Sequence, residues 1–406
     1  MTVEDARTTP PRHAVDSTVL PIIAAVSVGH LLNDLMQSLI PAVYPLLKSS
    51  LRLDFGQIGL VTLVFQGTAS ILQPLVGLYT DNRPLPYALA TGMGCTLAGL
   101  VFLSYAASFP LVLFSVALIG LGSAVFHPES SRVARLAAGT RPGFAQSFFQ
   151  VGGNVGSSLG PLLAAFIVVP NGQQSIKWFA GVALAGMAVL TAVGNWYSHE
   201  GRKRAVASKA RAAVASLPPK TVTFALAILV ALMFSKFVYM ASFSSYFTFY
   251  LIERFGLSVQ AAQINLFIFL AAVALGTIVG GPIGDRIGRK RVIWVSILGV
   301  FPLSVALPYV GPETTVILSA ASGMILASAF PAIVVYAQDL VPTKVGMIAG
   351  LFFGFAFGLG GIGAAVIGEI ADHTSISYAY QLCSFLPLIG LLAFFLPDTR
   401  QARSAA

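Results

Sequence analysis

Two stretches decide the fold of this chain: GGPIGDRIGRKR at residues 280–291 and GLYTDNRP at residues 77–84. Each stretch joins the end of a long apolar run to a polar turn, and each carries an aspartate near the junction, Asp285 or Asp81. The two aspartates lie 204 positions apart in a chain of 406 residues. This spacing is expected of two equivalent halves built from the same series of elements.

The composition excludes an ordinary soluble protein. Hydrophobic residues make up 56% of the chain, charged residues only 10%, and the mean hydropathy is +0.83. Apolar runs long enough to cross a bilayer as helices, about 20 residues, recur along nearly the whole chain. The runs are continuously apolar rather than alternating, which favours helices over a barrel. Breaks at Pro, Gly and charged residues predict twelve transmembrane helices, at residues 18–47, 56–80, 85–106, 110–137, 143–169, 176–198, 221–252, 257–284, 290–309, 313–341, 344–370 and 377–397.

One long polar stretch, HEGRKRAVASKARAAVASLPPK at residues 199–220, divides these helices into six and six. The predicted fold is therefore an all-α membrane protein of two pseudo-symmetric six-helix bundles. The predicted parts are an N-terminal tail (1–17), the first bundle (18–198), the basic linker (199–220), the second bundle (221–397) and a C-terminal tail (398–406). The first 17 residues are polar and contain two prolines, so we interpret them as a tail rather than a signal peptide.

Charge predicts the orientation of the helices. With twelve spans and a cytoplasmic amino terminus, nineteen of the 24 Lys and Arg residues fall on the cytoplasmic side. This asymmetry obeys the positive-inside rule and places both termini in the cytoplasm. The net charge of +9 is then a result of topology, so nucleic-acid binding is not required to explain it.

Motifs for catalysis or metal binding lack their structural context. Gly156, Ser158 and Gly160 spell GxSxG, but they lie within an apolar run instead of a strand-to-helix turn. The GxGxxG pattern at residues 358–363 follows no strand, and the HxE pattern at residues 127–129 has no downstream PCxxC. Cys95 and Cys383 lie in separate apolar runs, as packed thiols do. We expect no enzyme activity, no cofactor and no metal site.

The chain resembles the major facilitator superfamily, and within it the fosmidomycin resistance protein group. The superfamily resemblance rests on the six-plus-six arrangement, the basic central loop and the GPIGDRIGRKR motif. The group resemblance rests on HLLNDLMQSLIPAVYPLL (30–47), VFHPESSRVAR (125–135), FSKFVYMASFSSYFTFYL (234–251) and GLFFGFAFGLGGIGAA (350–365). The resemblance to this group implies a monomeric antiporter that exports an anionic phosphonate antibiotic by alternating access, driven by inward proton flow. An organic-anion or phosphorylated-metabolite exchanger or symporter of the same superfamily is the alternative.

A glycine pattern at residues 152–165, GGNVGSSLGPLLAA, resembles the antiporter motif of drug/proton exchangers. Gly152, Gly156 and Gly160 recur every four residues, which makes a flat helix face that another helix can approach closely. Pro161 permits a bend. A role in helix packing alone is the alternative interpretation.

The segment HLLNDLMQSL at residues 30–39 predicts the proton-coupling site. His30, Asp34, Gln37 and Pro41 share one helix face, which we expect to line a central cavity because ionisable groups are costly in lipid. Both His30 and Asp34 can exchange protons, the histidine near neutral pH. Glu129 and His127 are further candidates for proton coupling. A buried hydrogen-bonded pair that only holds helices together is the alternative.

Basic and polar residues within the spans predict the substrate site. Lys236 is the only basic residue deep in a span, and Arg132 lies nearer a helix end; either suits an anionic phosphonate. For Arg132, the alternative is a local salt bridge with Glu129. The other predicted lining residues are Gln37, Gln66, Gln73, Gln150, Asn154, Tyr239 and Tyr246.

The repeated stretches quoted first predict a conformational latch. The resemblance implies that Asp285, Arg286, Gly288 and Arg289, with Asp81 in the first half, join the cytoplasmic ends of the two bundles when the transporter faces outward. Asp285 is expected near the positive end of a neighbouring helix. A solvated charge cluster that only sets topology is the alternative.

Overall fold

The computed structural model describes residues 17–53, 55–201, 203–204, 218–257 and 259–397. Within these residues the structure is helical and contains no strand, so the predicted all-α class is confirmed. Nearly all of the two predicted tails, and residues 205–217 of the predicted linker, lie outside the described residues. The predicted domain boundaries stay predictions.

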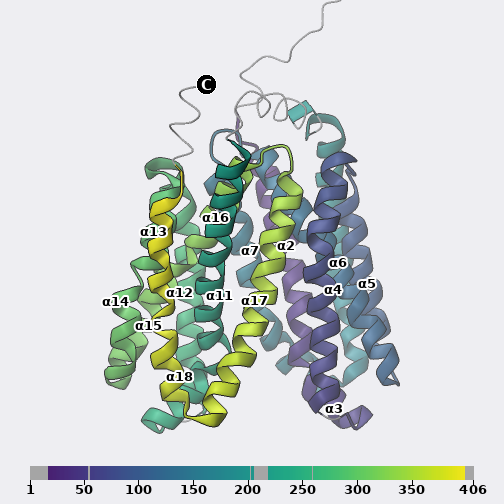
Figure 1. Cartoon of the computed structure of the whole chain (residues 1–406). Coiled ribbons are helices and arrows are strands. Elements are labelled where there is room, and N and C mark those ends of the chain that lie inside the picture. The colour runs from purple at the N-terminus through teal and green to yellow at the C-terminus, as the bar shows by residue number, and fades with distance from the viewer. Residues whose placement is uncertain (1–16, 54, 202, 205–217, 258, 398–406) are drawn as a thin grey trace, which may run out of the picture.

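The first half of the chain forms six spans that alternate in direction (Figure 1). They are α2 (Leu20–Ala42) continued by α3 (Tyr44–Leu51), α4 (Phe55–Asn82), α5 (Ala88–Ser104), α6 (Phe109–Ala137), α7 (Pro142–Leu163) continued by Ala164–Val168 and α8 (Val169–Asn171), and α9 (Ala180–Trp196) flanked by Gln173–Phe179 and Tyr197–Gly201.

The second half repeats this series. Its spans are α11 (Pro219–Phe255), α12 (Val259–Ile287), α13 (Arg289–Leu298) continued by α14 (Phe301–Ala306) and Leu307–Tyr309, α15 (Pro312–Ala327) continued by α16 (Ala329–Leu340), α17 (Val345–His373), and α18 (Ile376–Cys383) continued by the 3₁₀ helix Leu386–Phe395. All twelve predicted spans are found, and the largest differences are breaks within spans. The first span, for example, breaks between Ala42 and Tyr44.

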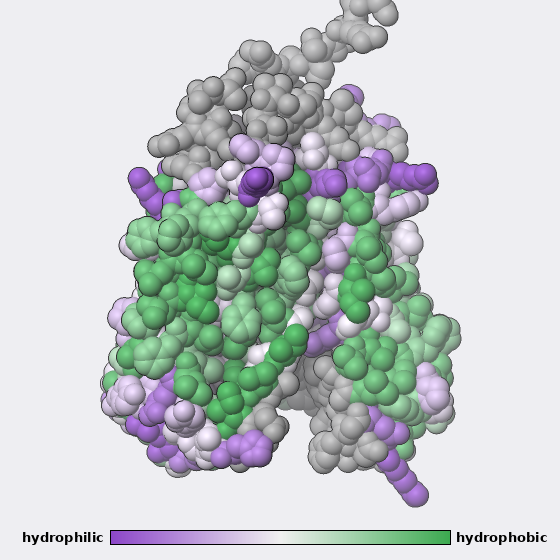
Figure 2. Space-filling view, viewed as in Figure 1, coloured by the Kyte–Doolittle hydropathy of each residue, from purple (hydrophilic) through white to green (hydrophobic). Residues whose placement is uncertain are grey.

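The surface is that of a multi-pass membrane protein. Figure 2 shows a broad hydrophobic band across the face in view, with hydrophilic residues concentrated above and below it. Large apolar side chains that are mostly exposed include Phe166 and Ile71. Within the described part of the chain, nine helices are long and apolar enough to cross a membrane, and Ala88–Ser104 is a shorter apolar helix.

The two halves of the molecule meet mainly through α4 with α17 and α7 with α12. Glycines bring the first pair close together: a Cβ added to Gly350 would overlap the Gln73 carbonyl, and one added to Gly77 would overlap the Gly346 carbonyl. Near the middle of the second pair, Asn154 Nδ2 donates to Thr277 Oγ1 at 3.2 Å.

Both described ends of the chain lie on one side of the molecule, which we call the termini side (Figure 1). The close contacts between the halves run from this side to about mid-depth. On the opposite side, the far side, Figure 2 shows a hollow between the two lobes. The described structure is therefore closed on the termini side and open toward the far side.

Candidate functional site

The polar centre of the first half is a cluster of three side chains, His30 and Asp34 on α2 and His127 on α6, which we call the His–Asp–His cluster. Asp34 Oδ2 lies 3.2 Å from His30 Nε2, and Asp34 Oδ1 lies 3.6 Å from His127 Nε2. The two imidazoles are 1% exposed and the carboxylate is 14% exposed. The one-turn spacing of His30 and Asp34 aligns them on α2, whereas His127 joins them only through the packing of α6.

The other ring nitrogens of the cluster establish its hydrogen-bonding pattern. His30 Nδ1 lies 2.9 Å from the Phe149 carbonyl oxygen, and His127 Nδ1 lies 3.0 Å from the Ser123 carbonyl oxygen. A carbonyl oxygen can only accept, so we assign a proton to each Nδ1. Each neutral ring then presents the lone pair of Nε2 to the Asp34 carboxylate. Lone pairs that face one another at these distances repel unless a proton lies between them, so the three side chains together can hold at least one proton.

Apolar rings enclose the histidines. Phe149 stacks on His30 with ring centroids 4.1 Å apart, and Phe353 and Phe357 of α17 contact the ring of His127 at 5.1 and 5.4 Å. Because α17 belongs to the second half of the chain, His127 lies at the junction of the two halves. A change in the separation of the halves would therefore alter the surroundings of this cluster.

The glycine pattern predicted on α7 packs directly against the cluster. A Cβ at Gly152 or Gly156 would overlap the carbonyl of Ser27 or Leu31 on α2. A Cβ at Gly153 would overlap His30 Nε2 and lie 2.8 Å from Asp34 Oδ2. The small residues thus let α7 cover the His30–Asp34 pair. Gly160 and Pro161, which complete the pattern, lie outside the described side chains.

We expect Gly153→Ala to impair transport strongly, because its methyl group would displace the His30–Asp34 pair. The matched control is Gly181→Ala, since a Cβ there has no neighbour within 4 Å. Transport by both variants at equal membrane abundance would be compared with that of the unmodified protein. Normal transport by Gly153→Ala would show that the pair tolerates displacement.

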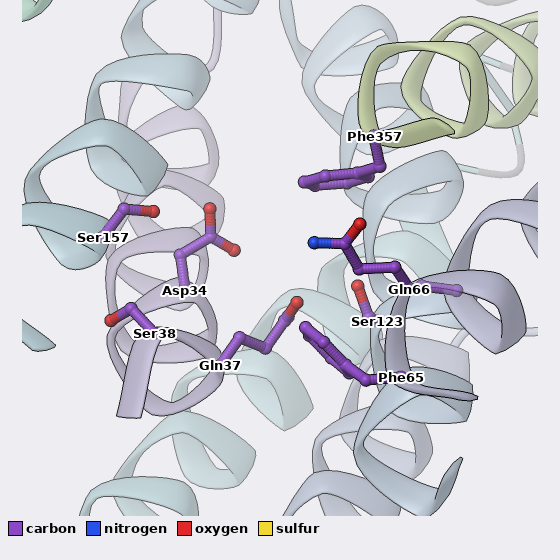
Figure 3. Close-up of a pocket in the computed structure, with 9 residues that line it drawn as sticks. Asp34, Gln37, Ser38, Phe65, Gln66, Ser123, Ser157 and Phe357 are labelled. Atoms are coloured by element: carbon purple, nitrogen blue, oxygen red, sulfur yellow. The ribbon is translucent and has the colours of Figure 1, made fainter. Parts of the chain in front are cut away.

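A cavity of about 160 Å³ borders the cluster on the side of Asp34. Figure 3 shows Asp34 and Gln37 directed from one side toward Gln66 and Phe357 on the other. The complete lining is Asp34, Gln37, Ser38, Phe65, Gln66, Ala69, Ser123, Ser157 and Phe357. Of the predicted lining residues, the structure brings Gln37 and Gln66 into this cavity beside Asp34.

Other predicted lining residues lie outside the cavity. The Gln73 side chain is fully buried, and a Cβ on Gly350 of α17 would overlap the Gln73 carbonyl. Gln150 and Asn154 lie on α7, where Gln150 Nε2 donates to Asn154 Oδ1 at 3.5 Å. Tyr239 is buried against Phe243, and Tyr246 is partly buried. The side chain of Pro41 is outside the described residues.

Lys236 is buried in α11 at 5% exposure. Its ammonium group lies 5.0 Å from the ring centre of Phe237 and 5.2 Å from that of Phe330, which are cation–π distances. No carboxylate among the described residues forms an ion pair with it. Phe330 in turn contacts Phe353, which contacts His127, so aromatic rings connect this lysine to the His–Asp–His cluster.

Arg132 lies in a separate buried network on the termini side. Its guanidinium lies 3.3 Å from Glu129 and 3.6 Å from Asp81, donates to the Thr80 carbonyl at 3.0 Å and covers the Tyr197 ring. The structure therefore places Arg132 and Glu129 together, in the local salt bridge that the sequence offered as the alternative. Neither residue contacts the cavity in this conformation.

The predicted latch residues cap helices of the opposite half. Asp285, at the end of α12, accepts from the backbone N–H groups of Gly143 and Phe144 at 2.9 Å, in the first turn of α7. Asp81, at the end of α4, accepts from those of Gly346 and Met347 at 3.0 and 2.9 Å, in the first turn of α17. A carboxylate at a helix amino terminus is stabilised by the free N–H groups and the helix dipole. Asp285 thus lies at the amino terminus of a neighbouring helix, as expected, and Asp81 makes the equivalent contact in the first half.

Asp339 and Arg135, which the sequence analysis did not assign to the latch, form an additional ion-pair group with Arg289 at the same ends. Asp339 of α16 pairs with Arg135 of α6, and Arg289 Nη1 lies 2.7 Å from Asp339 Oδ2. Arg289 also lies 3.5 Å from Asp285. Gly288 has a φ of 101°, a conformation that favours glycine and lets α13 begin directly after α12. Arg286 is exposed.

Several site residues gave no signal in the sequence. Ser38, Ser123, Ser157, Phe65 and Phe357 line the cavity, yet serine and phenylalanine are common in membrane helices. Asp339 offered a signal, an acidic residue near the end of a span separated from Arg135 by 204 positions, which is the repeat spacing. That coincidence could have predicted their pairing.

Family comparison agrees with this architecture. Residues 26–264 and 232–406 match the model of the Major Facilitator Superfamily, so nearly the whole chain is covered. The chain belongs to this superfamily. It is 57% identical to the fosmidomycin resistance protein of Escherichia coli (strain K12), over 94% of each chain. It is 41% identical to the uncharacterised transporter YfnC of Bacillus subtilis (strain 168), over 95% of each chain. The chain is thus a transporter of the fosmidomycin resistance protein group, not an enzyme.

Solved structures of superfamily members share the fold. FucP in the outward conformation superposes with a TM-score of 0.73 at 16% identity, covering 94% of this chain and 99% of FucP. The human organic anion transporter MFSD10 also gives 0.73 at 16% identity, covering 96% of this chain and all of MFSD10. At this identity the likeness extends to the superfamily fold alone.

Proposed function

We propose that this transporter exports fosmidomycin or related small anionic or amphiphilic compounds in exchange for protons. The observation that carries the proposal is the position of the Asp34 carboxylate between two imidazoles whose Nδ1 atoms are held by backbone carbonyls. This arrangement binds protons at Nε2 and at the carboxylate. The proton gradient is the only energy source that the proposal requires.

The cavity links proton binding to substrate binding. Asp34 is both a member of the cluster and part of the cavity wall, so an anionic substrate beside it meets a carboxylate whose charge depends on protonation. Exchange requires that the substrate compete with the protons of the cluster for the Asp34 carboxylate, as a hydrogen-bond donor of the substrate facing that carboxylate would. A substrate and the protons on the cluster therefore influence one another's binding, and linkage requires that this influence be mutual.

The direction of transport is inferred from the charge asymmetry and from the side on which the two halves are closed. The positive-inside rule assigns the termini side to the cytoplasm. The described conformation, closed on that side, would then face outward. In the proposed cycle, protons enter the cluster from outside, the halves exchange their open and closed sides, and substrate replaces protons from the cytoplasm. A bacterial inner membrane with both termini cytoplasmic is the proposed location, and the proposed working form is a monomer.

The substrate class rests on the name of the 57% identical relative and on charge. Lys236 is a buried cation without a carboxylate partner in the described part of the chain, and the superfamily transports through its centre. Such a charge is costly unless an anion or water reaches it. We assign Lys236 to the attraction of the anion, with Gln37 and Gln66 as neutral donors beside Asp34.

The test uses everted vesicles, in which export appears as uptake. With the protein present, an imposed pH gradient that is acidic inside the vesicles should drive fosmidomycin uptake. An ionophore that collapses the gradient should abolish this uptake. A panel of neutral drugs would define the substrate range. Uptake that does not depend on the pH gradient, or transport in the opposite direction, would refute proton-coupled export and favour an organic-anion exchanger.

The latch contributes a separate prediction. Asp285→Asn should weaken the cap on α7 and shift the population away from the outward-facing state, while substrate affinity changes little. Reporter cysteines on the two sides of the molecule would measure the shift through their rates of modification. Glu313→Gln, an exposed acid at the start of α15, is the matched control. Unchanged populations together with lost substrate binding would contradict the assigned role.

A further inference from the structure

The His–Asp–His cluster has the donor set of a transition-metal site. His30 Nε2, His127 Nε2 and a carboxylate oxygen of Asp34 all lie within 4.8 Å of one another. Adjacent ligands of a tetrahedral zinc ion, at about 2.0–2.1 Å from the metal, are about 3.3–3.4 Å apart. Asp34 Oδ2 lies 3.2 Å from His30 Nε2 and Asp34 Oδ1 lies 3.6 Å from His127 Nε2, so each imidazole has a carboxylate oxygen at about this spacing. The three side chains can therefore converge on one ion with small movements.

The surroundings of the histidines orient them as metal ligands. In metal sites, a ligating imidazole usually donates its other N–H to a carbonyl or carboxylate, which fixes the ring and the tautomer. Both histidines of the cluster do this, His30 to Phe149 and His127 to Ser123. The lone pairs of both Nε2 atoms are thus directed to the same point as Asp34. His30 Nε2 is buried, and its polar neighbour is Asp34 Oδ2 at 3.2 Å.

The fourth coordination position faces the cavity. Asp34 lines it, so water or a substrate oxygen can reach an ion bound there. The other neighbours are uncharged: they include Asn33, which donates to Asp34 Oδ1 at 3.1 Å, Gly153 and Phe149 from α7, and Phe353 and Phe357 from α17. Within the described residues, no cationic side chain is paired with Asp34 other than the two histidines themselves. A divalent ion would consequently meet one negative charge and no competing lysine or arginine.

We propose that the cluster binds a divalent transition metal of borderline softness, with Zn²⁺ as the representative ion, and that the bound ion arrests transport. Imidazole and carboxylate ligands suit Zn²⁺ and related first-row ions. The metal occupies the lone pairs that otherwise hold protons, and it clamps α2 to α6. The proposal departs from the expectation of no metal site, which was based on spacing along the chain and did not include the packing of His127 beside His30. The transport cycle itself requires no metal.

Binding would be measured on the purified full-length protein carrying a tag without histidines, so that the tag does not capture the ion. Titration calorimetry with Zn²⁺ should show one site per chain. Co²⁺, whose visible absorption is more intense in four-coordinate than in octahedral sites, should give a four-coordinate spectrum that Zn²⁺ displaces. Zn²⁺ should also raise the melting temperature, since a ligand bound only by the folded state stabilises it.

The variants Asp34→Asn, His30→Gln and His127→Gln should each weaken Zn²⁺ binding at least about tenfold. His199→Gln, outside the cluster, is the matched control and should bind as the unmodified protein does. Failure of the folded, unmodified protein to bind Zn²⁺, or equal binding by the three cluster variants, would overturn the proposal. These binding measurements do not depend on the proposed function, so a metal site could be disproved while proton coupling stands, and the reverse. Inhibition of export by Zn²⁺ rests on the proposed function and would be measured separately in everted vesicles.

Discussion

Replacement of Asp34 by asparagine is expected to reduce gradient-driven export to background while leaving substrate binding intact. Asparagine keeps the size of aspartate and resembles its protonated form, but it carries no charge and releases no proton. Without the carboxylate between them, His30 and His127 lose the partner with which they share protons. Export would be measured as uptake into everted vesicles, and binding as fosmidomycin affinity of the purified variant.

The pH dependence of binding gives this prediction a second readout. If substrate binding displaces protons, the affinity of the unmodified protein rises as pH is raised, because linkage is reciprocal. The Asp34→Asn variant should lose much of that pH dependence, because it has no carboxylate to share protons with the two histidines. Glu313→Gln serves as the control for loss of an acid elsewhere. Normal gradient-driven export by Asp34→Asn would transfer the coupling role to Glu129, His127 or Asp339.

Lys236→Met should weaken the binding of an anionic phosphonate by roughly tenfold to a hundredfold, the range expected for the loss of a charged hydrogen bond. Methionine keeps a long apolar stem against Phe237 and Phe330 but removes the ammonium group. A neutral substrate of similar size should bind almost as before. Affinities for both compounds would be measured on the purified protein.

The control for Lys236 is Lys220→Met, an exposed lysine at the start of the same helix. It tests whether the loss of any positive charge on α11 weakens binding. Equal weakening for the anionic and neutral compounds would show that Lys236 acts through packing. No weakening for either would remove it from the substrate site.

The fold was largely predictable because bilayer thickness constrains the chain so strongly. Twelve apolar stretches of the required length, and an aspartate repeated at Asp81 and Asp285, were sufficient to predict two six-helix halves. The breaks within spans were harder to predict from the sequence. α15 gives way to α16 at Ser328, three residues before Pro331, whose missing N–H indicates a break without giving its position.

The candidate site was predictable only where its residues share a helix. His30 and Asp34 lie one turn apart on α2, so their pairing follows from helical geometry. The addition of His127 depends on how α6 packs against α2, and no local pattern encodes it. Arg132 shows the converse: its charge suggested a substrate ligand, but Glu129, Asp81 and the Thr80 carbonyl surround it in the fold.

The sequence predicted the type of polar contact between the halves better than it predicted the partner residues. Sequence suggested that Asp285 lies at a helix amino terminus, and the helix is α7. The equivalent cap of α17 by Asp81, in a motif that lacks the basic run found after Asp285, shows that the cap does not require that run. The ion-pair group around Asp339 is formed by residues of three helices, so the sequence of any single helix could not predict it.

The most direct test of the central claim, that the His–Asp–His cluster exchanges protons for substrate, is proton release on substrate binding. Saturating fosmidomycin would be added to the purified protein in weakly buffered detergent solution containing a pH indicator. The account predicts proton release by the unmodified protein and little or none by Asp34→Asn with the same amount of substrate bound. Equal release by both proteins would contradict it.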